Sequence, residues 1–240
     1  MMEQQLQPAA ATSLARPPAP FSFPSTLVPS SLSPMLYHLA DAANWASIQR
    51  YGLLSTSALL DLARIEGNER ERIERQHRAE RVTLATGTVI RDQQPMPPAA
   101  LARCLRGMTP AEWYALLNAH VFFWLASDRL NRMLKANYPR PQVVLVLETA
   151  PLLAAYADRI ALTPINTGNA RRQPAVRGRQ TFVPYQIWRE SRWASEAGAL
   201  GGRERPKSHR PAELVVRQGV PDIMSFVRYV RWLQPGESFT

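Results

Sequence analysis

Four polar features of this 240-residue sequence lie where side-chain chemistry could occur. His38 falls inside an apolar stretch, and Glu213 interrupts another one, two residues after a proline. Two glycine-bearing segments lie between them in the chain, residues 166–168 (Asn-Thr-Gly) and residues 177–178 (Arg-Gly). Each feature has an ordinary structural explanation, because core histidines, solvent-facing strand glutamates and Asn-Thr-Gly turns are common. Any shared chemistry therefore requires the fold to bring these features together.

Common catalytic and binding signatures are absent from the sequence. It contains no GxxxxGK[ST] or GxGxxG loop for phosphates and no GxSxG nucleophile elbow. The four histidines, His38, His77, His120 and His209, have no zinc-like spacing, so we expect no metal site. The only cysteine, Cys104, has no catalytic signature around it, and we expect it to be buried in a helix.

The composition is typical of a soluble globular chain, with 45% hydrophobic and 20% charged residues. No apolar run approaches the roughly 18 residues needed to cross a bilayer, so no membrane association is expected. A single cysteine cannot form an internal disulfide, which favours a reducing, cytoplasmic location.

The net charge of +10 comes almost entirely from arginine, since Lys135 and Lys207 are the only lysines. A guanidinium donates two parallel hydrogen bonds, which suits phosphate groups. A GC-rich genome explains the arginine excess equally well. It does not remove the positive field, which attracts nucleic acid or nucleotides.

The chain divides into two parts by composition. Residues 1–34 are rich in proline, alanine and serine and contain only Glu3 and Arg16 as charged residues, which predicts a disordered leader. The leader lacks the basic and apolar regions of a secretory signal. Residues 35–240 are expected to form one domain.

The pattern of apolar residues predicts the elements that would hold the polar features. Strands are expected at residues 36–39, 121–125, 143–147, 160–162, 212–216 and 227–232. Helices are expected at residues 57–65, 98–106 and 109–118, and also after Asp41, after Ser127 and at Pro151. We expect a solvated helical face at residues 66–81, a hairpin at residues 82–92 and an irregular region at residues 163–211. Helices and strands without regular alternation predict an α+β fold.

Several helix ends are marked by specific residues. Asp41 and Ser127 are expected to cap the helices that follow them, and Gly52 is expected just past the end of the first helix. Thr109, with proline after it and Glu112 three residues on, predicts a capping box.

Two blocks of this sequence resemble the ADP-ribosyltransferase superfamily, especially the DarT-type nucleic-acid ADP-ribosyltransferases and the RNA 2′-phosphotransferases. The opening block is residues 36–39 (LYHL), in which a strand histidine precedes a helix, and the turn at residues 52–55 (GLLS). The closing block is residues 212–216 (AELVV), in which a glutamate begins a strand, followed by residues 220–223 (VPDI). From Met35 onward the chain also resembles an uncharacterised bacterial domain family that shares the blocks YHLAD, INTG, RG..TF and AEL.V.

The resemblance implies a split mixed β-sheet core with surrounding helices, and an NAD site with a histidine, an aromatic residue and a glutamate from three strands. His38 matches the histidine that binds a ribose hydroxyl, and Glu213 matches the catalytic glutamate; both are expected to be catalytic. The carboxylate would stabilise positive charge as the nicotinamide–ribose bond breaks and would deprotonate the incoming nucleophile. A tyrosine is common at the aromatic position, where this chain offers Phe122, Phe123 and Trp124. Phe123 or Trp124 would stack on nicotinamide.

The resemblance also implies contacts from loops to NAD. The turn that contains Gly52 and Ser55 would bring backbone amides close to the nicotinamide carboxamide. Asn166, Gly168 and Arg177 would contact the pyrophosphate or the acceptor, because guanidinium groups and small-residue loops suit anions.

Three functions stay open from the sequence. The first is an NAD-dependent ADP-ribosyltransferase that modifies DNA or RNA, of the toxin or defence type. The second is a catalytically inactive nucleotide- or RNA-binding module of the same fold, since the usual tyrosine is missing. The third is an NAD-dependent 2′-phosphotransferase that acts on RNA. The first requires His38, Phe123 and Glu213 to line one cleft, and no oligomeric state is indicated.

Overall fold

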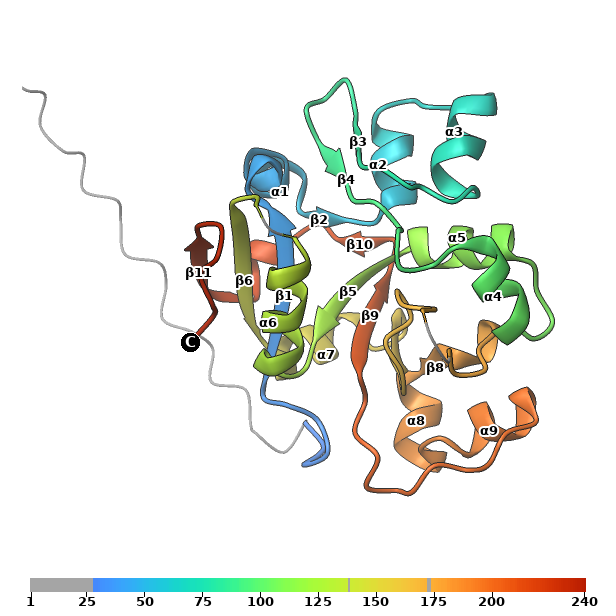
Figure 1. The fold of residues 1–240 in the computed structure, drawn as a ribbon. Helices are drawn as coiled ribbons and strands as arrows, with labels where there is room; N and C mark the ends of the chain where they lie inside the picture. The colour runs from blue at the N-terminus through green and yellow to red at the C-terminus, as the bar shows by residue number, and fades with distance from the viewer. Residues whose placement is uncertain (1–27, 138, 172–173) are drawn as a thin grey trace, which may run out of the picture.

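The computed structural model describes residues 28–137, 139–171 and 174–240. Its centre is a seven-stranded sheet with the strand order β11-β6-β1-β5-β9-β7-β8 (Figure 1). The strands are β1 (Met35–Asp41), β5 (His120–Trp124), β6 (Gln142–Glu148), β7 (Ile160–Thr163), β8 (Val183–Pro184), β9 (Glu213–Arg217) and β11 (Val227–Leu233). All the strands expected from the sequence are confirmed, and β8 was not expected.

All neighbouring strands of this sheet pair antiparallel, so the expectation of a mixed sheet is wrong for the described residues. β5 and β6 run in the same direction, but β1 lies between them. β6 and β7 also run in the same direction and are separated by three strands. The helices that connect these pairs, α6 (Ser127–Ala136) and α7 (Thr149–Tyr156), therefore each cross over at least one antiparallel strand.

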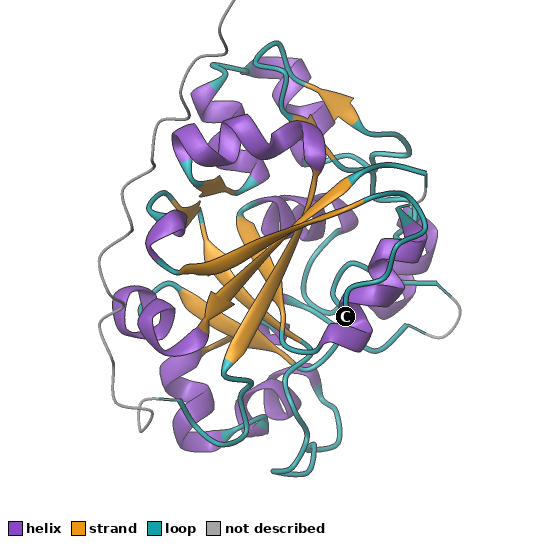
Figure 2. Cartoon of the chain, turned by 90° about the vertical axis from the view of Figure 1, so that its left-hand side faces the viewer, coloured by secondary structure: helices purple, strands orange, loops and turns teal. Residues whose placement is uncertain are grey.

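Helices cover both faces of the sheet, which Figure 2 shows as a strongly twisted layer. On one face, Leu145 of β6 packs with Leu152 of α7 and Trp188 of α8 (Tyr185–Ser191). On the other face, Val144 packs with Leu134 of α6, and α4 (Pro98–Cys104) and α5 (Pro110–Asn118) pack over β7 and β9. Within the described ranges, no helix is both long and apolar enough to cross a bilayer.

The sheet is split between β1 and β5. β1 pairs with β6 along its whole length, from Met35 to Asp41. With β5 it shares a single residue pair, Tyr37 with Trp124. The two strands therefore separate on either side of this pair, and the sheet opens near its centre.

Asp41, Gly52 and Thr109 mark helix ends as expected from the sequence, whereas Ser127 does not. Asp41 caps the 3₁₀ turn η2 (Ala42–Asn44) that leads into α1 (Trp45–Tyr51), and Gly52 follows that helix at a φ of 77°. Ser55 caps α2 (Thr56–Leu62). The capping box of Thr109 is confirmed. Ser127 is not a cap, because it is the first residue of α6 and Ala126 occupies the cap position.

Smaller elements surround one end of the split. The solvated helical face expected at residues 66–81 is confirmed for α3 (Gly67–Glu74) and is wrong beyond it, where the chain leaves the helix and Arg78 is buried. β3 (Val82–Thr83) and β4 (Val89–Ile90) form the hairpin expected at residues 82–92, with Gly87 in the turn at positive φ. β2 (Leu53–Leu54) pairs with β10 (Gly219–Val220), and the 3₁₀ turn η4 (Ile223–Ser225) follows. This pairing brings the opening and closing blocks of the sequence side by side.

The expectation of an irregular region at residues 163–211 is wrong in part. This segment contains the 3₁₀ turn η3 (Arg179–Thr181), β8, α8 and α9 (Ala194–Leu200). Trp188 and Trp193 are buried and pack edge to face, with ring centroids 6.0 Å apart. Burial of two tryptophans stabilises helical structure that the local arginine, glycine and proline content does not predict.

Order begins before Met35. Residues 1–27 of the expected leader lie outside the described residues. Leu32 is 5% exposed and packs in the main hydrophobic core. The carbonyl groups of Ser33 and Pro34 accept hydrogen bonds from the side chain and the backbone of Thr149, at 2.7 and 2.9 Å. Residues 28–34 therefore belong to the folded part of the chain.

Candidate functional site

A cavity of about 560 Å³ opens at the split between β1 and β5. It has the size of a typical small-molecule site. Its walls come from β1, β5 and β9, from the segment that follows β4 and from α6. The sequence-predicted residues that line it are His38, Gly52, Ser55, Trp124, Asn166, Gly168 and Glu213. Phe123 and Arg177 do not line it.

The sheet register brings His38 and Glu213 to one place. Tyr37, Trp124, Glu213 and Thr163 form a continuous row across β1, β5, β9 and β7. Adjacent strands lie about 4.8 Å apart, so the backbone of Glu213 is roughly 10 Å from that of Tyr37. By strand alternation His38 points to the opposite side of the sheet from Tyr37 and Glu213. Its ring lies in the gap where β1 and β5 separate, with Nδ1 at the Phe122 carbonyl, and His38 and Glu213 line the same cavity from there.

Glu213 is a buried carboxyl group, only 3% exposed. Burial raises its pKa to about 7, because the charged form loses its hydration. Hydrogen bonds from Thr167 and Thr163 and the positive charge of Arg129 oppose this rise. The group therefore exchanges a proton near neutral pH, which suits general acid–base chemistry.

The two oxygen atoms of Glu213 have different surroundings. Oε2 accepts hydrogen bonds from the hydroxyl groups of Thr163 and Thr167, at 2.9 and 2.8 Å, and from the Thr167 backbone amide at 3.2 Å. Oε1 accepts only the same amide, at 3.3 Å. Among the described residues, Oε1 thus keeps acceptor capacity for a ligand in the cavity.

His38 is held as a neutral imidazole. Its Nδ1 lies 2.8 Å from the Phe122 carbonyl oxygen, which only accepts, so Nδ1 carries the proton and Nε2 is an acceptor. Burial lowers the pKa of His38 to about 4, and the nearby charge of Arg91 also lowers it. At neutral pH, Nε2 can accept a hydrogen bond from a hydroxyl group.

The aromatic residues of β5 divide between the cavity and the core. Phe122 and Trp124 line the cavity, whereas Phe123 is fully buried in the main core. Successive side chains of a strand point to opposite faces, so Phe123 and Trp124 cannot both contact one ligand. The condition set from the sequence, that His38, Phe123 and Glu213 line one cleft, is therefore met by His38 and Glu213 and fails for Phe123. The Phe123 ring packs beside His38, with centroids 5.6 Å apart, and the aromatic surface of the cavity comes from Phe122 and Trp124 instead.

The turn at Gly52 and Ser55 lines the cavity, but these two backbone amides are not free. The Gly52 amide donates to Ile48, and the Ser55 amide donates to Gln218, each at 2.9 Å. A Cβ atom at Gly52 would lie 2.1 Å from the Pro221 carbonyl oxygen. Glycine is required here for close packing of the opening and closing blocks.

The segment at residues 166–168 lines the cavity beside Glu213. The side chain of Asn166 accepts a hydrogen bond from the Gly168 amide at 3.0 Å, which forms the expected turn. Thr167 turns toward Glu213. Arg177 lies behind this turn, 2% exposed, and donates to the Thr167 carbonyl at 3.1 Å.

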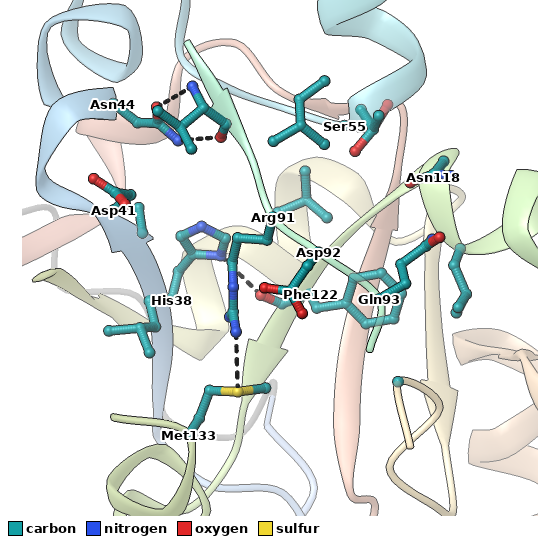
Figure 3. Close-up of a pocket in the computed structure, with 18 of the residues that line it drawn as sticks. His38, Asp41, Asn44, Ser55, Arg91, Asp92, Gln93, Asn118, Phe122 and Met133 are labelled. Atoms are coloured by element: carbon teal, nitrogen blue, oxygen red, sulfur yellow. Dashed lines mark hydrogen bonds between the residues drawn. The ribbon is translucent and has the colours of Figure 1, made fainter. Parts of the chain in front are cut away.

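Arg91 is a cavity residue that the sequence interpretation missed. It runs past the His38 ring toward α6, as Figure 3 shows, and donates to Asn137 at 2.6 Å and to the sulfur of Met133 at 3.5 Å. Burial lowers the pKa of Arg91, but a guanidinium stays charged at neutral pH. In the part of the chain that the structure describes, Arg91 forms no ion pair.

The segment that carries Arg91 is fixed from two sides. The amide side chain of Asn44 bonds both backbone groups of Val89, at 2.9 and 2.7 Å. Arg78 donates to the Arg91 carbonyl at 3.1 Å and exchanges hydrogen bonds with Gln93. Hydrogen bonds from Asn44 and Arg78 therefore fix the backbone from which the Arg91 side chain enters the cavity. No sequence motif marks this arrangement.

Comparisons with known proteins give the following results. A solved structure similar to this chain is that of Thermus sp. 2.9 DarT in complex with NAD+, with 14% identity, a TM-score of 0.37 and coverage of 84% of this chain and 82% of that chain. Comparison with curated proteins gives no match. The model of a family of unknown function, DUF7002, matches residues 34–227. Because this match includes most of the sequence, the chain belongs to the DUF7002 family.

Proposed function

We propose that this protein is an NAD-dependent ADP-ribosyltransferase-like enzyme, with Glu213 and His38 as its catalytic residues. The observation that carries the proposal is the single cavity that joins a carboxyl group titrating near neutral pH with a neutral acceptor imidazole. Perturbed titratable groups that converge in a cavity are typical of active sites.

The residues present fit NAD by their chemistry. The Nε2 atom of His38 accepts from a hydroxyl group, as a ribose would offer. Arg91 supplies a positive charge for a pyrophosphate, and no carboxylate neutralises it by an ion pair in the described ranges. Phe122 and Trp124 offer apolar ring surface to a flat heterocycle. The cavity therefore offers partners for a ribose hydroxyl group, a pyrophosphate and one flat ring of a dinucleotide.

Glu213 would act at the ribose carbon of NAD that loses nicotinamide and bonds the acceptor. NAD supplies a glycosidic bond to nicotinamide whose cleavage develops positive charge on the ribose. An ionised Glu213 stabilises that charge through Oε1 and accepts the proton of the attacking group. Its pKa of about 7 places the proton transfer in the neutral range.

Nucleic acid is the acceptor that the charge distribution favours. Arg78, Arg140 and Arg171 line the cavity in addition to Arg91, and the carboxyl groups that line it are those of Asp41, Asp92 and Glu213. The whole chain carries a net charge of +10. Phosphate groups of DNA or RNA near the cavity would be held by these guanidinium groups.

The test is incubation of the protein with labelled NAD and separate pools of DNA, RNA and protein. Wild-type protein should transfer label to nucleic acid, and Glu213→Gln should abolish transfer while it still binds NAD. Glu148→Gln, at a carboxylate outside the cavity, is the matched control and should transfer normally. Absence of NAD binding and turnover with every pool would overturn the proposal.

A binding module without turnover is the second candidate. It is favoured by Phe122, which lacks the hydroxyl group of the tyrosine common at this position. In this case NAD or RNA binds equally well to wild-type protein and to Glu213→Gln, and no label is transferred. RNA with a 2′-phosphate distinguishes the third function, a 2′-phosphotransferase, from the other two. A phosphotransferase would remove this phosphate only when NAD is present.

A further inference from the structure

Arg177 is a buried cation that does not reach the cavity. Its guanidinium lies 5.8 Å from the centroid of the Trp113 ring and next to Cys104. Burial lowers the pKa of Arg177, and the charge of Glu213 opposes this change. Among the described residues, Arg177 forms no ion pair. A buried, unpaired guanidinium is costly, so its contacts need an explanation.

The backbone of Arg177 is fixed at both ends. Its amide donates to the Cys104 carbonyl at 2.9 Å, and its carbonyl accepts from the Arg106 amide at 2.8 Å. The neighbouring Gly178 packs so closely that a Cβ atom would lie 2.6 Å from the Arg106 carbonyl oxygen. The side chain therefore starts from a rigid base at the end of α4.

The side chain connects this base to the turn that holds Glu213. Nη1 donates to the Thr167 carbonyl at 3.1 Å, and Nε donates to the Ala175 carbonyl at 3.0 Å. Thr167 is fully buried and uses its amide and hydroxyl groups on Glu213. Thr167 thus contacts Glu213 with its donors and Arg177 with its acceptor.

The two threonines that hold Glu213 differ in support. Thr163 belongs to β7, where its position opposite Glu213 is fixed by the sheet. Thr167 lies in a turn outside any regular element. A loop residue keeps its geometry only if other contacts reduce its conformational freedom.

We propose that Arg177 is a positioning residue that fixes Thr167 and thereby the donors that hold Glu213 in the cavity. The expected effect on NAD turnover rests on the proposed function, whereas the effect on the position of Thr167 and on the titration of Glu213 does not. The charge of Arg177 also favours the ionised carboxylate. The interaction of Arg177 with Glu213 is evident in the pKa of Arg177, which Glu213 raises, whereas the cation that lowers the pKa of Glu213 is Arg129 of α6.

The experiment compares Arg177→Met and Arg177→Lys with a matched control, Arg179→Gln. Arg179 is an exposed arginine two residues away and contacts neither Thr167 nor Glu213. The protonation of Glu213 is followed by NMR of ¹³C-labelled glutamate carboxyl groups, with the signal assigned by its loss in Glu213→Gln. Thermal unfolding verifies that each variant is folded.

In Arg177→Met, the Glu213 titration should move to higher pH, because a cation and an oriented donor set are lost. Arg177→Lys keeps the charge but loses the paired hydrogen bonds to the Thr167 and Ala175 carbonyl groups, so it should shift the Glu213 titration less. Arg179→Gln should leave the Glu213 titration unchanged. NAD turnover in Arg177→Met should lose roughly tenfold in kcat, with KM changed by less than about threefold.

The inference is overturned if Arg177→Lys and Arg177→Met leave the Glu213 titration at the wild-type position. If only Arg177→Lys folds, its titration alone decides the question. The proposed function fails separately, if Glu213→Gln turns over NAD like wild type while the titration of Glu213 still responds to Arg177.

Discussion

The two polar walls of the cavity contain opposite kinds of titratable group. The Glu213 wall, made of Glu213 with Thr163 and Thr167, holds a carboxyl group whose pKa burial raises to about 7. The His38 wall, made of His38 and Arg91, holds an imidazole whose pKa burial lowers to about 4. Burial disfavours charge on both walls, and it therefore retains a proton on the acid and removes one from the base.

This difference assigns separate tasks to the walls. Above about pH 5, His38 stays a neutral acceptor, and it lies beside the guanidinium of Arg91. The Glu213 wall changes its protonation at about pH 7. The first wall is suited to bind a ligand, and the second wall is suited to exchange protons with it.

The largest expected effect separates the two walls kinetically. Glu213→Gln should lower kcat of NAD turnover by roughly 1,000-fold with little change in NAD affinity, because only the reacting step uses its charge. His38→Ala should act mainly on KM, by roughly tenfold, because it removes a binding acceptor. Steady-state kinetics with direct NAD titration measures both. Equal effects of the two variants on kcat would contradict the assignment of the chemical step to Glu213 and of ligand binding to His38.

The walls should also give opposite pH dependence of stability. Folded Glu213 keeps its proton up to pH 7, whereas an unfolded glutamate releases it near pH 4.5. Its contribution of about 3 kcal/mol is complete below pH 4.5 and lost as the pH rises to 7. His38 stays neutral down to about pH 4 when folded and is protonated near pH 6.5 when unfolded, so its contribution is lost as the pH falls.

Urea unfolding of wild type, Glu213→Gln and His38→Gln across pH 4–8 measures these contributions. The stability difference between wild type and Glu213→Gln should shift against the wild type as the pH rises from 4.5 to 7. The difference between wild type and His38→Gln should shift against the wild type as the pH falls from 6.5 to 4. Differences that stay constant with pH would show that burial does not control either group.

Within the His38 wall, a variant of Arg91 tests whether its positive charge contributes to NAD binding. Arg91→Met should weaken NAD binding by roughly tenfold, because a cation that crosses the cavity beside His38 is removed. The same change at Arg75, which pairs with Glu71 on the surface of α3, is the control and should have no effect. Isothermal titration at two salt concentrations measures the binding. An unchanged affinity would remove Arg91 from the ligand site.

The smallest effect is expected between the walls, on β5. Phe122→Leu should weaken NAD binding by only about two- to fivefold, because some apolar surface remains. Phe123→Leu should leave binding almost unchanged and should lower the free energy of unfolding by about 1 kcal/mol, because this ring is in the core. Binding and urea unfolding of both variants check the assignment. The reverse pattern would return Phe123 to the ligand site.

The sequence was sufficient for those parts of the fold where local pattern and burial agree. The strand with His38, the continuous apolar strand β6 and the Thr109 capping box were all predicted. α8 and α9 were missed because their stability comes from the burial of Trp188 and Trp193 rather than from local periodicity.

The composition of the cavity was harder to predict, because it depends on register and support. The alternation of β5 could have separated Phe122 and Trp124 from Phe123, since adjacent strand residues face opposite ways. Arg91 could not be found, because its place depends on hydrogen bonds to Asn137 and Arg78 from distant parts of the chain. Arg177 was expected at the ligand and instead stands behind Thr167.

The single residue pair between β1 and β5 has a mechanical consequence. Outside this pair, the two halves of the sheet are connected there by the His38 side chain, which bonds the Phe122 carbonyl where backbone bonds are missing. A ligand that contacts both strands therefore links the two halves of the sheet where backbone hydrogen bonds are missing. Occupancy then raises the resistance of the whole domain to unfolding in proportion to the logarithm of ligand concentration.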